Sequence, residues 1–242
     1  MKTSDKILLG FCLAVLCIFS AAHLELYARF RQGKITTNRE GSEGWIGLYH
    51  GKAPAVLFVG GNVNVTLVPS DSFFIDYEER ARGQIGLQQP GNDSLIVMAA
   101  DVDRVNPRGI FQNYSEFPWM AVHAGPHTRI LLQDVLALVK GPNDRQAASW
   151  DLVAKNSQVW IGEAYGDNNL CVRESYDSVQ IDAKNSNLVL HRNSVIQSLF
   201  VQLDARSEVN DHHAVIGKPV IRYADSSNIN MTGRNLDKLR NK

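Results

Sequence analysis

Histidines that could bind a metal occur as two pairs in this chain. His123 and His127 flank Ala-Gly-Pro, and His212 and His213 are adjacent. Two histidines four residues apart can bind zinc on a helix, but the intervening Gly-Pro prevents a regular helix here. No third ligand is indicated for the first pair, and the second follows Asn210-Asp211 and could make a metal site. We interpret the first pair as part of a loop and the second as a solvated turn, and we predict no metal site.

Two groups of titratable residues could perform acid–base chemistry. Asp101 and Asp103 lie two residues apart and would share one face of a strand. Asp182, Lys184 and His191 belong to consecutive strand-like segments and could converge on one face. Paired carboxyl groups can cleave glycosidic bonds or bind calcium. The first pair directly precedes an Asn-Pro-Arg-Gly turn signal, and the second group is typical of an ordinary solvated face, so we predict no catalytic residue.

Cofactors and nucleic acids are not indicated as partners. Gly60-Gly61 and the Gly83–Gly86 segment lack the strand, loop and helix context of a phosphate-binding motif. The chain has 25 basic and 25 acidic side chains, which argues against a strongly basic nucleic-acid surface. Two of its three cysteines, Cys12 and Cys17, lie in an apolar run, so Cys171 is the only cysteine left for the folded part. The sequence therefore predicts neither a disulfide there nor a four-cysteine zinc site.

The N-terminal segment predicts attachment to a membrane. Residues 7–22 contain no charge, and extending the run to residue 30 gives a length sufficient to cross a bilayer. The alternative is a secretory signal cleaved after Ala22, since Ser-Ala-Ala is a suitable cleavage site. We favour an uncleaved single-pass anchor within 1–31 that contacts the cell membrane through residues 7–30. Lys and Arg counting would leave the body in the cytoplasm, but the short N-terminal tail resembles an export signal. We expect the main domain on the periplasmic or extracytoplasmic side.

The rest of the chain has the pattern of an all-β protein. Residues 32–44 are polar and are interpreted as a linker, and residues 236–242 as a charged tail. Between them, over 45–235, short apolar segments with a period of two alternate with Gly, Asn, Asp and Pro. Residues 129–138 are the best helix candidate in this part, although they could equally be paired strands. An apolar cluster at residues 117–120 is interpreted as core.

A repeat near 20 residues runs through the C-terminal half. Ser157, Ser178 and Ser198 each begin a similar apolar segment, with spacings of 21 and 20 residues. A second short strand lies in each interval. This period predicts a parallel β-solenoid, a single-stranded right-handed β-helix, because stacked coils bury together what one coil cannot bury alone. Asn would occupy the corners and the serines could form a ladder. An antiparallel sandwich or barrel is the alternative.

These segments resemble a known family. Residues 63–73 (VNVTLVPSDSF) look like an opening strand and turn, Asp93-Ser94-Leu95-Ile96-Val97 ends a strand pair, and Asn-rich corners follow. With the N-terminal apolar run, they resemble bacterial auto-transporter adhesins with a GIN-type head domain, which are predicted exported β-helical proteins. The resemblance covers most of 45–235 and supplies no catalytic residues. Cys12 and Cys17 lack a convincing lipobox, so a lipid anchor is not expected.

Together these patterns predict a membrane-tethered, exported binding or structural module that is not an enzyme. A regular β-solenoid offers a long, rigid surface for an extended partner such as a glycan or an envelope protein. Two alternatives stay open. One is a polysaccharide lyase or hydrolase on the same fold, which would need acids converging in one groove. The other is a scaffold that polymerises end to end at the membrane.

Overall fold

The computed structural model describes residues 20 and 24 and the ranges 44–99, 119–142, 147–162 and 173–240. The chain divides into two compact units, Met1–Gly44 and Trp45–Lys242. In the first unit Ser20 and Leu24 are helical, and the rest of the expected anchor at 7–30 lies outside the described residues. Within the described part of the chain, no helix has the length and apolar character needed to span a bilayer.

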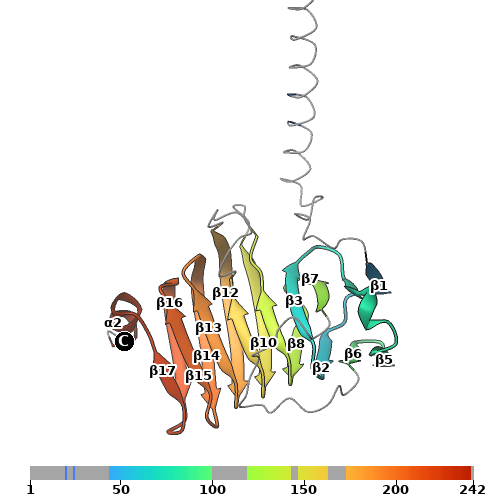
Figure 1. The fold of residues 1–242 in the computed structure, drawn as a ribbon. Helices are drawn as coiled ribbons and strands as arrows, with labels where there is room; N and C mark the ends of the chain where they lie inside the picture. Colours follow the sequence, from blue (N-terminus) through green and yellow to red (C-terminus); the bar gives the residue numbers. More distant parts are fainter. Residues whose placement is uncertain are drawn as a thin grey trace, which may run out of the picture. The chain divides into compact units, whose positions relative to one another are not determined.

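The second unit is an all-β structure of two mostly parallel sheets, as predicted (Figure 1). Sheet A contains, in spatial order, β1 (Trp45–His50), β4 (Phe74–Glu78), β7 (Trp119–Ala124), β3 (Asn64–Pro69), β9 (Leu136–Val139), β11 (Gln158–Ile161), β13 (Asn187–His191), β15 (Glu208–His212) and β17 (Asn228–Asn230). Sheet B contains β16 (Val215–Tyr223), β14 (Ser194–Asp204), β12 (Glu174–Lys184), β10 (Ala148–Lys155), β8 (Arg129–Gln133), β2 (Val56–Gly60), β6 (Ser94–Ala99) and β5 (Ile85–Gly91).

From β8 onward the chain alternates regularly between the sheets. Each strand of sheet B is followed by one of sheet A, and each pairs in parallel with its equivalent in the next layer. Gln180 pairs with Phe200, which pairs with Val220, so these layers repeat every 20 residues. The predicted period and parallel pairing are confirmed here. Asp151 pairs with Gln180, a longer step of 29 residues, because the connection after β11 is longer.

The N-terminal end of the second unit departs from uniform parallel winding. Strand β4 is antiparallel to β1 and β7, and β5 is antiparallel to β6. The prediction of one parallel stack over all of 45–235 is therefore wrong for this end. For β5 and β6 the physical reason is local: Asn92-Asp93 form a two-residue turn between paired Gly91 and Ser94, and so short a loop can join only antiparallel neighbours.

The layers at this end are also out of sequence order. Strand β2 lies between β6 and β8, and β3 lies between β7 and β9. In chain order, β2 and β3 come before β4 to β7, which lie on one side of the β2–β3 layer. Strands β8 and β9 then follow on the opposite side of that layer. Nothing in the 20-residue period of the C-terminal half indicates this insertion.

Residues 129–138, the helix candidate, form parts of β8 and β9 in different sheets. The turn between them places Asp134 at φ 56°, in the left-handed region. Equivalent corners place Asn156 at φ 49° and Asn185 at φ 50°. Asn tolerates this conformation better than most residues, so the predicted role of Asn at corners is confirmed at these two positions.

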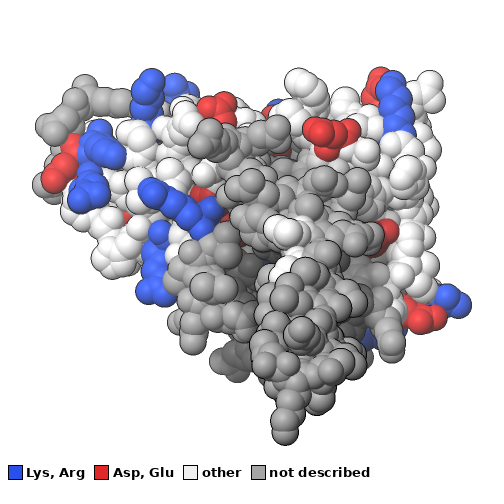
Figure 2. Space-filling view, turned by 90° about the horizontal axis from the view of Figure 1, so that it is seen from above, with Lys and Arg blue, Asp and Glu red and all other residues white. Residues whose placement is uncertain are grey.

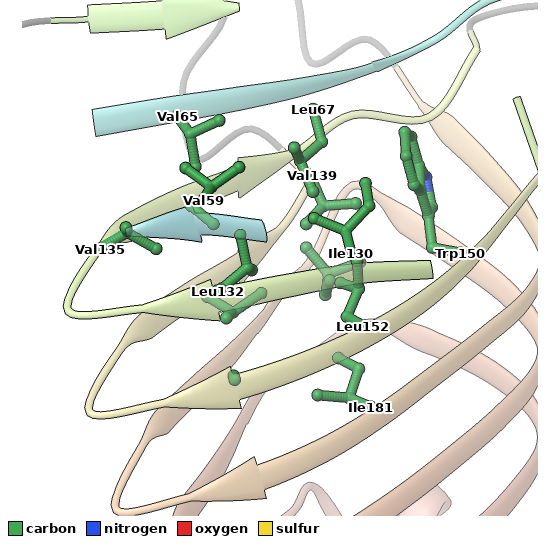
Figure 3. Packing of buried hydrophobic residues seen from close by; sticks show 14 of the residues in the cluster. Val59, Val65, Leu67, Ile130, Leu132, Val135, Val139, Trp150, Leu152 and Ile181 are labelled. Carbon is green, nitrogen blue, oxygen red and sulfur yellow. The ribbon is translucent and has the colours of Figure 1, made fainter. Parts of the chain in front are cut away.

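The core lies between the two sheets (Figure 3). Every second residue of each strand points inward, and equivalent residues stack from layer to layer. One inward row of sheet B consists of Leu57, Ile130, Leu152, Ile181 and Val201, all paired in register and all essentially inaccessible to solvent. Because each side chain contacts its equivalents above and below, the apolar interior is continuous from layer to layer.

The predicted serine ladder is only partly correct. Ser178 and Ser198 pair in register on β12 and β14, but Ser157 belongs to a corner of the structure. There the Ser157 N–H donates to Ser186 Oγ at 3.1 Å, and the Ser186 N–H donates to Ser207 Oγ at 3.3 Å. All three corner serines are buried. They satisfy backbone groups that the tight corner removes from water.

The segment expected as a charged tail contains most of a helix. Helix α2 (Gly233–Arg240) packs against β16, the edge strand of sheet B. The Lys238 ammonium donates to the carbonyl oxygen of Ile216. The only other helical element of the described second unit is η1 (Glu79–Ala81), a single 3-10 turn. Helix α2 therefore covers the end strand of sheet B.

Candidate binding surface

The residues considered for catalysis are not brought together. Asp182 and Lys184 lie on the outer face of sheet B, whereas His191 lies on the outer face of sheet A. The three therefore do not converge on one face, because their strands belong to opposite sheets. Asp182 instead forms an ion pair with Arg129, in which Oδ2 lies 3.1 Å from Nη2. The Arg129 Nε atom also lies 3.8 Å from Asp151 Oδ1. Asp101 and Asp103 lie outside the described residues.

The histidines of the two pairs lie in strands and at corners of the second unit. His123 lies in β7, so the loop interpretation is wrong for it, while His127 lies in the exposed turn that follows. His212 ends β15, so the turn interpretation is wrong for it, and His213, at φ 65°, forms an isolated β-bridge with His191. Both histidines are exposed, as predicted. Across the described ranges, no group of three or more His, Cys, Asp or Glu side chains is arranged to hold a metal ion.

The glycine segments and the apolar cluster have structural places. Gly61 and Gly83 have φ angles of 87° and 80°, which only a residue without a Cβ adopts readily. Met120, within the cluster at 117–120, is fully buried, and Trp119 is half-buried in β7. Met120 therefore confirms the core interpretation, while Phe117 and Pro118 lie outside the described residues.

His123 stacks on Phe74 with a centroid separation of 3.8 Å and an interplanar angle of 11°. Burial lowers the pKa of His123 to about 4 from its usual 6.5. Because the folded state resists protonation, the unfolded chain takes up this proton first as the pH falls. The stability that the neutral ring contributes is complete above pH 6.5 and is lost between pH 6.5 and about 4.

We expect wild-type protein to lose about 2 kcal/mol of unfolding free energy across that pH range through His123, with about 3 kcal/mol as a ceiling before solvent screening. His123→Phe keeps a ring against Phe74 but cannot titrate, so its stability should fall less on acidification. Urea unfolding at pH 7.5, 5.5 and 4 measures the difference. Equal acid losses in both proteins would contradict the assignment.

The outer face of sheet A changes character along the stack. On β3 and β9 most outward side chains are buried, including Asn64 at 0% and Leu136 at 2% exposure. From β13 to β17 most outward side chains are half-buried and then exposed, although Val189 on β13 is buried. We call this second region the amide face; its outward residues on β13, β15 and β17 are Asn187, Val189, His191, Glu208, Asn210, His212, Asn228 and Asn230.

Amide side chains on this face are linked from layer to layer. Asn210 Nδ2 donates to Asn187 Oδ1 at 3.2 Å, and Asn230 Nδ2 donates to Asn210 Oδ1 at 3.3 Å. Each amide carries two N–H donors and an oxygen with two lone pairs. The Asn210 amide therefore retains one donor and one acceptor position after both links are made. The row holds polar groups in fixed orientations on a surface that solvent reaches.

Aromatic and imidazole rings border the amide row. The Trp160 and His191 rings meet edge to face at 5.8 Å, and the His191 and His212 rings do so at 6.0 Å. Burial, and secondarily the charge of His212, lowers the pKa of His191. The His191 Nε2 atom is buried and has no hydrogen-bond partner among the described residues. Rings and linked amides thus lie on the same face of sheet A.

The outer face of sheet B is different. Ile96, Phe58, Leu131 and Val153 pair in register across four strands and form a half-buried apolar row, with Met98 beside it at 42% exposure. Further along, the row continues with Asp182, Gln202 and Arg222. Nothing in the described structure indicates what would cover the apolar part.

On the face seen in Figure 2, several Lys and Arg side chains lie toward the end that carries α2, and acidic side chains lie both there and elsewhere. Helix α2 itself contributes Arg234 and Lys238. The amide face is not part of this pattern, because Glu208 is the only Asp, Glu, Lys or Arg among its outward residues.

The amide face was not identified from the sequence. Eleven of the 18 asparagines fall within 143–235, and the sequence pattern predicts Asn at corners only. Asn187, Asn210 and Asn230 are separated by 23 and 20 residues, close to the repeat. That spacing, combined with their position inside strand segments, is the signal that could have revealed them.

Comparison with known proteins adds little. No family model and no curated protein matches the chain. Among the solved structures that resemble it, three are each named a "putative adhesin". That from Parabacteroides distasonis is 10% identical, with TM-score 0.47, covering 80% of this chain and 75% of that one. That from Bacteroides fragilis is 10% identical, with TM-score 0.35, covering 78% of this chain and 98% of that one. That from Parabacteroides merdae is 12% identical, with TM-score 0.29, covering 79% of this chain and 93% of that one. At this similarity they reveal nothing about what this chain binds, and the resemblance to a GIN-type head stays a prediction.

Proposed function

We propose that this protein is a non-catalytic, adhesion-like binding module: a β-solenoid of the GIN-type adhesin kind, held at the cell membrane by residues 7–30 and displayed outside the cytoplasm. The observation that carries the proposal is the amide face, a regular outer surface where amides are linked strand by strand at 3.2 and 3.3 Å. Groups that are repeated on stacked strands and linked from strand to strand suit an extended partner. They do not converge on a point, as reacting groups must.

The end of the stack also favours a binding role over a polymerising scaffold. End-to-end growth requires edge strands with free backbone groups. Helix α2 packs on the edge strand β16, and the neighbouring edge strand β17 has only three residues. Pro219 within β16 removes a further backbone donor from that edge. Such an end is poorly suited to add another copy.

Retention by the cell envelope tests the binding role. Full-length protein is reconstituted into liposomes. The liposomes are mixed with the insoluble polymer that remains after cell envelopes are extracted with detergent. Flotation then separates free liposomes from those retained on the polymer. Protein-bearing liposomes should be retained on the polymer, and empty liposomes should not. Equal flotation of both would contradict the proposal.

Sidedness is tested separately. Added protease should digest the body in intact cells or spheroplasts, with the mass of the undigested chain measured by blot. A chain that retains residues 1–22 supports the anchor, and a shorter chain supports cleavage. Full protection in spheroplasts would refute display outside the cytoplasm.

A further inference from the structure

The amide row is organised before any ligand arrives. The links at 3.2 Å from Asn210 to Asn187 and at 3.3 Å from Asn230 to Asn210 restrict the rotamers of three side chains. A ligand that binds them therefore loses less free energy to the ordering of side chains than it would on a mobile surface. The half-buried Asn210 retains a donor and an acceptor, so one amide can serve both a hydroxyl oxygen and a hydroxyl hydrogen.

The charge of the surface restricts the class of ligand. Among the outward residues of β13, β15 and β17, Glu208 alone is an acidic or basic residue of the Asp, Glu, Lys and Arg set. A polyanion such as nucleic acid or an acidic polysaccharide would find no Lys or Arg on this face and would be repelled by Glu208. A ligand rich in uncharged donors and acceptors matches it.

The direction of the row restricts the shape of the ligand. The linked amides lie on three neighbouring parallel strands, which are separated by roughly 4.8 Å. A peptide adding as a strand would need a free sheet edge, and these groups belong to a sheet face. A polymer whose hydroxyl groups repeat at about the distance between neighbouring strands can lie across the strands and contact one amide in each layer.

We propose that the amide face binds a neutral polysaccharide laid across β13, β15 and β17, with Asn187, Asn210 and Asn230 as its hydrogen-bonding row. The His191 and Trp160 rings, whose centroids lie 5.8 Å apart, border the row and offer apolar surface for a sugar ring. The inference rests on the proposed binding role and names the class of partner for it.

Affinity electrophoresis through native gels containing a soluble polysaccharide tests the proposal. Full-length protein is kept in a polyoxyethylene detergent, because a sugar-based detergent would compete. The probes are hydroxyethyl cellulose, xyloglucan, mannan and dextran as neutral polymers, with polygalacturonate as an anionic one. Wild-type protein should be retarded by at least one neutral polymer and not by the anionic one.

The matched variants are Asn210→Ala/Asn230→Ala on the amide face and Gln180→Ala/Gln202→Ala, two exposed amides on the outer face of sheet B. The first should weaken retardation about tenfold, and the second should leave it unchanged. Asn228→Arg places a bulky side chain on the face without removing a linked amide, and it should weaken binding even where the double variant folds poorly. The proposal would be overturned if both Asn228→Arg and a folded double variant bound as well as wild type. It would also be overturned if wild-type protein were retarded by the anionic polymer alone or by none of the neutral polymers.

The two proposals can fail separately. If liposomes bearing Asn210→Ala/Asn230→Ala protein are retained on envelope polymer as well as wild type, the polysaccharide assignment is wrong and the binding role stands. If wild-type liposomes are not retained, the binding role itself is wrong.

Discussion

Replacing Asp211 with alanine is expected to detach the C-terminal cap and lower the unfolding free energy by about 3–5 kcal/mol, since hydrogen bonds to charged groups contribute roughly 1.5–3 kcal/mol each and several are lost together. Asp211 lies on the inward side of β15, at a position where the preceding layers carry Leu190 and Ile161. It is 7% exposed. A buried carboxylate at the end of an apolar row must have partners.

Those partners belong to the cap. The Asp211 carboxylate accepts from the Ala214 N–H at 2.8 Å, from the Thr232 N–H at 3.2 Å, from Thr232 Oγ1 at 2.7 Å and from Asn235 Nδ2 at 2.7 Å. Asn235 also donates to the Ala214 carbonyl at 2.8 Å. One side chain therefore ties the start of α2 and the residues after β17 to the end of the core.

Hydrogen exchange and urea unfolding together measure this effect. In Asp211→Ala, amides of β17 and α2 should exchange much faster, and the unfolding midpoint should fall. Asp211→Asn keeps one acceptor oxygen and should lose about half as much stability. Asp225→Ala, at an exposed turn, is the control and should behave like wild type. If Asp211→Ala and Asp225→Ala cannot be distinguished, the cap does not depend on this carboxylate.

Leu152→Ala is expected to destabilise the protein by about 3–4 kcal/mol, because leucine-to-alanine changes in a packed core cost roughly 2–5 kcal/mol. Leu152 is fully buried in β10 and pairs with Ile130 on one side and Ile181 on the other. A cavity at this position interrupts the stack in its middle, so both halves lose contacts. Figure 3 shows these three side chains in the space between the sheets.

The neighbouring Val153→Ala supplies the control. Val153 is on the same strand but faces outward and is half-buried, so its truncation should cost about 1 kcal/mol or less. Buried Trp150, on the same strand, reports unfolding by fluorescence. Similar losses for the two variants, or a greater loss for Val153→Ala, would contradict the inward assignment of Leu152.

Sequence alone determined the repeating part of this protein. The period near 20 residues, with two apolar segments per period, follows from a physical requirement: equivalent positions must be apolar in every layer for a stack to bury them. Gln180, Phe200 and Val220 occupy equivalent positions as that period requires. Asn at tight corners was predictable for the same reason, because backbone conformation at a corner is a local property that Asn156 and Asn185 satisfy themselves.

Tertiary structure alone decided the rest. Consecutive strands from β8 onward join different sheets, and this separates His191 on β13 from Asp182 on β12 although their spacing is short. The antiparallel strands at the N-terminal end, and the insertion of β2–β3 between later layers, depend on contacts between residues far apart in the chain. The amide face arises in the same way: Asn187, Asn210 and Asn230 become neighbours only when parallel strands stack, because backbone hydrogen bonding between layers brings residues 20 or more positions apart into contact.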